Sequence, residues 1–119
     1  MSLRVASVVT VGVTPPGGSP SADGVSTYSF RGEGFYEFEV SRTFNTSAGD
    51  NVVTIAPIAN VKSLYIKSDS PIDVKLTSAG GTLQVVPLDK VLYIECPNRP
   101  ITAITITGAA RGTIAMAGD

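Results

Sequence analysis

The segment from Val61 to Gly118 constrains the fold most strongly, because it consists of short runs in which apolar and polar residues alternate. Gly, Pro and Ser residues interrupt these runs at intervals of roughly ten residues. Alternation with a period of two places every second side chain on the same face of a strand. Evenly spaced strands and turns are typical of antiparallel β-sandwiches and barrels. The segment therefore predicts a series of half-buried antiparallel strands.

The run Ile72, Val74 and Leu76 shows this pattern clearly. We expect its three apolar side chains to face the core and the residues between them to face water. The Ala-Gly-Gly link at residues 79–81 predicts a hairpin into the next strand, because glycine readily adopts the positive φ angles of tight turns.

The N-terminal part of the chain is less regular. Residues 3–13 alternate well enough to predict a first strand. Residues 14–24 contain a Pro-Pro pair and three glycines, which predict an exposed loop. In residues 36–40, aromatic or aliphatic residues alternate with glutamate. We therefore expect Glu37 and Glu39 on the outer, acidic face of a half-buried strand.

The whole pattern predicts an all-β protein with about eight or nine short strands, rich in Val, Ile and Thr and without a helix. We expect an antiparallel, jelly-roll-like β-sandwich that forms a single domain over residues 1–119. Residues 1–24 would be an extended strand and loop available for intersubunit contacts. An immunoglobulin-like sandwich is the alternative, although the sequence lacks the Cys…Trp…Cys pattern of that class.

The composition offers little for catalysis or for nucleic-acid binding. The chain has no histidine, which is the usual general base and a common metal ligand. Its nine basic and ten acidic residues are dispersed, whereas binding to phosphates favours clustered Lys and Arg. The N-terminus resembles neither a signal peptide nor a membrane helix. We therefore expect a non-enzymatic, soluble protein without a cofactor, a metal ion, a membrane or a nucleic acid as partner.

Three groups of reactive side chains have simpler interpretations than catalysis. Cys96 is the single cysteine and shares the parity of its apolar neighbours, so it is expected to be a small buried hydrophobe at a strand end. Glu37 and Glu39 would lie about 6–7 Å apart on one strand face, a distance at which paired carboxylates can cleave glycosides. A solvated sheet face explains them better, because the neighbouring aromatic residues point the other way. Asp69 is expected to form a turn rather than to bind calcium.

Aromatic residues gather early in the chain, where six of the eight fall between residues 28 and 44. Phe35 would face outward beside the two glutamates, which favours a contact surface because aromatic residues are enriched at interfaces. The alternative is that the chain itself covers this segment.

Residues 61–76 and 101–119 resemble small structural proteins of tailed bacteriophage particles, with a strand reading LYIKSDSPIDVKL and a closing ITAITITG. The resemblance implies a capsid decoration or cement protein that binds the major capsid protein, or a neck, tail or baseplate adaptor. It also implies synthesis in the host cytoplasm, a place in the virion and a homo-oligomer. The residues expected to make these contacts are Val9, Val11, Val13, Pro15, Pro16, Phe35, Glu37 and Glu39.

A carbohydrate-binding module for host adsorption is the main alternative function. It would need an exposed aromatic platform, for which Tyr65 and Tyr93 are candidates on outward parity. An oligonucleotide-binding barrel is less well supported, because no basic groove accompanies the aromatic residues.

Overall fold

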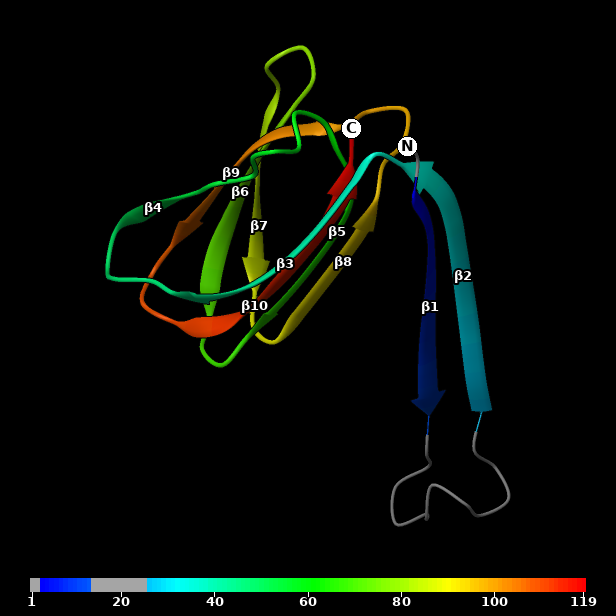
Figure 1. The fold of residues 1–119 in the computed structure, drawn as a ribbon. Coiled ribbons are helices and arrows are strands. Elements are labelled where there is room, and N and C mark those ends of the chain that lie inside the picture. Colours follow the sequence, from blue (N-terminus) through cyan, green and yellow to red (C-terminus); the bar gives the residue numbers. More distant parts are fainter. Residues whose placement is uncertain (1–2, 14–25) are drawn as a thin grey trace. The chain divides into compact units, whose positions relative to one another are not determined.

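The structure is a computed structural model that describes residues 3–13 and 26–119, and these residues contain strands and no helix (Figure 1). The all-β, antiparallel fold predicted from the sequence is confirmed, with ten strands in the described residues. The strands are β1 (Leu3–Val13), β2 (Ser26–Tyr36), β3 (Phe38–Asn45), β4 (Asp50–Val53), β5 (Val61–Ser68), β6 (Ile72–Ser78), β7 (Leu83–Leu88), β8 (Val91–Glu95), β9 (Ile101–Thr107) and β10 (Arg111–Gly118).

The chain forms two compact units. The smaller unit spans Arg4–Phe35, and the larger contains Tyr36–Asp119. In the smaller unit, β1 and β2 form a two-stranded sheet, which we call the N-terminal ribbon. The predicted first strand, β1, takes β2 as its pairing partner in this unit.

The larger unit has the strand order of a jelly roll. Its eight strands form two antiparallel halves, β3-β10-β5-β8 and β4-β9-β6-β7. The halves are joined where Val61 of β5 pairs with Ile101 of β9. The first and last of the eight strands are neighbours, as in two nested Greek keys. Immunoglobulin domains instead place their strands in ABED and CFG sheets.

Both halves contribute to one hydrophobic core, as the alternation of apolar residues predicted. Ile72, Val74 and Leu76 of β6 are all buried, which confirms the inward face expected for them. Fully burying such a side chain contributes roughly 1.5–3 kcal/mol. The largest fully buried side chains are Leu64, Ile66, Ile104, Ile106, Ile114, Met116, Val61 and Val74.

The predicted hairpin at residues 79–81 joins β6 to β7. Gly80 and Gly81 have φ angles of 98° and 85°, which residues with a side chain rarely adopt. The Gly81 N–H donates a hydrogen bond to the Ser78 carbonyl at 2.9 Å. The turn places β7 antiparallel to β6 and at the end of its half-sheet.

Candidate interaction surfaces

The N-terminal ribbon carries four of the residues predicted to make contacts. Val9, Val11 and Val13 lie on β1, and Phe35 lies near the end of β2. Pro15 and Pro16 lie outside the described residues. The role of all these residues in contacts stays a prediction.

The ribbon is a long sheet of only two strands. Its two strands are 11 residues long each, or about 35 Å at the usual rise per residue. Within the described residues, β1 and β2 pair only with each other, so each has one open edge. A two-stranded sheet alone is marginally stable in water, and an open edge offers backbone groups to another strand. The ribbon is therefore the first candidate surface.

The alternating segment at the start of the larger unit follows its predicted pattern. Tyr36 is buried and Phe38 and Val40 are half-buried, whereas Glu37 and Glu39 are exposed. Burial raises the pKa of the Tyr36 hydroxyl, and the nearby charge of Glu95 raises it further. The two glutamates thus occupy the solvated outer face that the sequence indicated.

Asp119 joins the start of β5 to the residue before β3, a contact that the sequence did not indicate. Its carboxylate accepts a hydrogen bond from Lys62 Nζ at 2.5 Å and another from the Glu37 backbone N–H at 3.0 Å. The Lys62 and Glu37 donors lower the pKa of Asp119. No local pattern could predict this cluster, because it joins residues 57 and 82 positions apart.

A second polar cluster lies across β4, β9 and β6. The Asp50 carboxylate accepts hydrogen bonds from Thr107 Oγ1 at 2.6 Å and from Lys75 Nζ at 3.2 Å. The hydrogen bond from Thr107 and those from Lys75 lower the pKa of Asp50. Asp69 instead accepts the Arg111 backbone N–H at 2.9 Å, a contact with the start of β10, 42 positions along the chain. In residues 3–13 and 26–119, no group of three or more His, Cys, Asp or Glu is placed to hold a metal ion.

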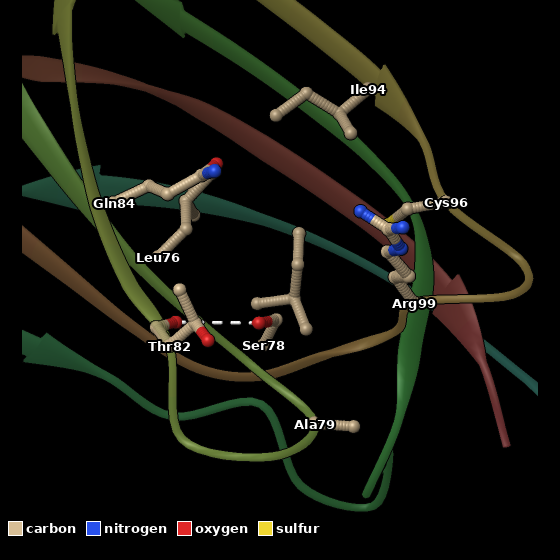
Figure 2. A pocket seen from close by; sticks show the side chains of 9 residues that line it. Leu76, Ser78, Ala79, Thr82, Gln84, Ile94, Cys96 and Arg99 are labelled. Atoms are coloured by element: carbon tan, nitrogen blue, oxygen red, sulfur yellow. Dashed lines mark hydrogen bonds between the residues drawn. The ribbon is translucent and has the colours of Figure 1, made fainter.

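A pocket of about 450 Å³ opens between β7 and β8, the end strands of the two half-sheets (Figure 2). Its apolar lining comes from Leu76, Ile94 and Ile101. Figure 2 shows the polar ends of Gln84 and Arg99 on two sides of the pocket. The remaining lining residues are Ser78, Ala79, Thr82 and Cys96.

Cys96 directly follows β8 and packs, half-buried, against the core. Burial raises the pKa of its thiol, and its Sγ lies 3.7 Å from the Val61 carbonyl oxygen. A thiol with a raised pKa forms little of the nucleophilic thiolate at neutral pH. This environment fits the small hydrophobe that the sequence predicted.

Strand β7 exposes two of its apolar residues to solvent. Leu83 is 57% exposed and Val85 is 53% exposed, and Gln84, which lies between them and lines the pocket, is also exposed. Val52, on β4 at the other end of the same half-sheet, is 84% exposed. The sequence could not show this, because Leu83 and Val85 alternate with polar and apolar neighbours as a buried pair would.

The proposed carbohydrate platform is only partly accessible. Tyr65 of β5 lies directly opposite Tyr93 of β8, and both side chains are half-buried. The Tyr93 hydroxyl and one Glu95 carboxylate oxygen are buried, and neither has a hydrogen-bond partner in the described part of the chain.

No protein-family model matches the sequence, and no curated protein matches it significantly. The described segments contain no helix long and apolar enough to cross a membrane.

Proposed function

We propose that this chain is a non-enzymatic structural component of a phage particle, a decoration or cement protein that binds across capsid subunits and stabilises the shell. The observation that carries the proposal is the N-terminal ribbon, a two-stranded unit distinct from an eight-stranded antiparallel sheet with its own core.

The ribbon suits a protein that binds to its neighbours through backbone contacts. Strand addition supplies main-chain hydrogen bonds to the added strand, and alternate side chains provide specificity. A ribbon that gains a third strand also gains the stability that two strands lack. The long strands of this chain can therefore be stabilised by the same contact that joins two molecules.

The architecture of the larger unit is compatible with this role. Jelly rolls form viral capsid proteins, but also lectin domains and cupins, so the fold supports the proposal without deciding it. The resemblance of residues 61–76 and 101–119 to phage particle proteins favours the capsid among these uses.

A decoration protein stabilises a shell by mass action, because it binds the assembled state and not the free subunits. At a free concentration of 100 times Kd, this linkage contributes roughly 2.7 kcal/mol per site. Contacts of that size, repeated over a shell, raise the temperature at which the shell opens.

The test is binding of the purified chain to capsids assembled without it, measured by co-sedimentation and by the temperature of capsid disruption. We expect saturable binding, a higher disruption temperature and no binding to free capsid subunits. Binding to purified tails instead would support the neck, tail or baseplate adaptor. No binding to capsids or tails would refute the particle role.

The Tyr65–Tyr93 pair favours carbohydrate binding as a second candidate, since adjacent aromatic side chains on one sheet face can stack on sugars. A glycan array measures this function directly. Binding that is lost in Tyr65→Ala would support it, and the absence of glycan binding would remove it.

A further inference from the structure

We infer that the outer edge of β7 accepts the N-terminal ribbon of a second copy of this chain, through addition of β1. The inference rests on the proposed function, in which the ribbon makes intermolecular contacts, and it names the partner and the surface. Three observations carry it: the free edge of β7, its outward apolar side chains and the charge of Asp73 on the neighbouring β6.

Strand β7 is an open sheet edge with little protection. It pairs only with β6 in the described part of the chain, and its sequence LQVVPL contains no charged residue. Proteins usually protect such edges with charges, bulges or proline, and here only Pro87 serves that purpose. Residues 83–86 therefore form an uncharged edge on which a strand can add.

The exposed side chains of β7 give the added strand a surface to pack against. Leu83 and Val85 project outward from this edge, and each remains more than half exposed. Gln84, which lies between them and lines the pocket on the other face, is exposed as well, so residues 83–85 are all accessible in the single chain. A strand that added here would cover apolar surface that the single chain leaves in water.

Strand β1 is the better match for this edge within the ribbon. Its sequence LRVASVVTVGV carries a single charge, Arg4, whereas β2 carries both Arg31 and Glu33. An uncharged edge such as β7 can pair with a strand of this composition without burying a charge.

The positions of the charges favour antiparallel addition. Arg4 stands at the beginning of β1, and Asp73 lies opposite Pro87 near the end of β7. In an antiparallel arrangement these two ends meet, which places opposite charges near each other. A parallel arrangement would bring Arg4 to the Leu83 end of β7 instead, near Arg99 on the rim of the neighbouring pocket.

The first test measures self-association of the full chain by light scattering over a range of concentrations. We expect the unmodified chain to self-associate and Val85→Lys to weaken the association at least about tenfold, because a lysine on an edge strand opposes strand addition and removes apolar contact with the added strand. The matched control is Val52→Lys, an exposed valine on the other end strand of the same half-sheet. Thermal unfolding of each variant confirms that it is folded.

The second test exchanges the two charges. We expect Asp73→Arg and Arg4→Asp each to weaken self-association and the double variant to recover most of it. Failure of the recovery, or an equal loss in Val52→Lys and Val85→Lys, would overturn the assignment of β1 to β7. If Asp73→Arg weakens self-association but Arg4→Asp does not, β7 would pair with β7 of the second copy. This result would also overturn the assignment of β1 to β7.

The outcomes separate this inference from the proposed function. A chain that binds capsids but remains monomeric at its highest soluble concentration would refute the second copy as partner and leave the particle role intact. A chain that self-associates through β7 but binds neither capsids nor tails would support the inference and refute the particle role.

Discussion

Gly112 and Gly118 occupy positions on β10 where the adjacent backbone leaves no room for a side chain. A Cβ added at Gly112 would overlap the Lys67 carbonyl oxygen and come within 2.6 Å of Cζ of Phe44. At Gly118 it would overlap the Asn60 carbonyl oxygen. Both glycines therefore permit β10 to lie close to its neighbours.

The close approach at Gly112 gives a prediction for stability. We expect Gly112→Ala to lower the free energy of unfolding by about 3 kcal/mol, because backbone atoms must move to relieve the overlap. Urea denaturation measures the change. The exposed Ala103→Ser on β9 serves as control and should stay within about 0.5 kcal/mol of the unmodified chain. A loss below about 1 kcal/mol in Gly112→Ala would show that β10 shifts freely.

Three aspartates make the fold sensitive to acid. Hydrogen-bond donors lower the pKa of Asp50, Asp69 and Asp119 below the ordinary value of 3.8. A carboxyl whose pKa is lowered by folding contributes stability that is complete above the unfolded pKa and is lost as pH falls through the folded pKa. We therefore expect the urea midpoint to be flat near neutral pH and to decline below about pH 4.

The variant Asp69→Asn isolates one of these groups. Its amide oxygen can still accept the Arg111 N–H, but it no longer titrates between the folded and unfolded pKa values. We expect a shallower loss of stability with acid than in the unmodified chain, measured as urea midpoints from neutral pH downward. An identical slope would mean that Asp69 has no part in the acid response.

The half-buried environment of Cys96 predicts that its thiol reacts slowly with disulfide reagents. Burial raises its pKa, so we expect it to react with an aromatic disulfide reagent more slowly than glutathione does at the same pH. The chain unfolded in guanidinium provides the control and should react quickly. A folded chain that reacts as fast as glutathione would contradict the half-buried position.

At the scale of elements, the larger unit has a hydrophobic core of its own within residues 36–119. All of the buried residues in its hydrophobic cluster lie between Ile58 and Met116. We therefore expect a chain that begins at Tyr36 to fold without the ribbon, as judged by dispersed NMR amide signals and a cooperative thermal transition. An unstructured product would show that β1 and β2 are required for the fold of the larger unit.

The strands and their faces were largely predictable from the sequence, because alternation is a local property. The inward faces of β3 and β6 and the hairpin at residues 79–81 follow from such patterns. The outward orientation of Leu83 and Val85 could not be predicted in this way. Period-two alternation determines which residues share a face but not which face is buried.

Strand pairing and the polar clusters escaped prediction for a related reason. The order β3-β10-β5-β8 joins strands that are distant in sequence, and no local signal states which strands become neighbours. The contact of Lys62 with Asp119 depends on that order, as does the hydrogen bond from Thr107 to Asp50. The residues predicted for contacts all precede Val40, and no local pattern drew attention to the edge of β7.

At the scale of the whole molecule, self-association would couple stability to concentration. If a second copy binds the folded state only, the thermal midpoint rises with protein concentration. We expect this increase in the unmodified chain and a much smaller one in Val85→Lys. Calorimetry over a roughly hundredfold range of protein concentration measures both. A midpoint independent of concentration in the unmodified chain would mean that the folded state gains nothing from other copies.

The central position of β10 also has a consequence for how the molecule is made. This strand lies between β3 and β5, yet it is synthesised after all the other strands of the described chain. Until then, β3 and β5 have no partner on the sides that β10 later occupies. Most pairings in this half-sheet join residues far apart in sequence, as in proteins of high contact order that fold slowly. The nascent chain therefore exposes two long strand edges during synthesis, and a chaperone that shields them would raise the yield of folded protein.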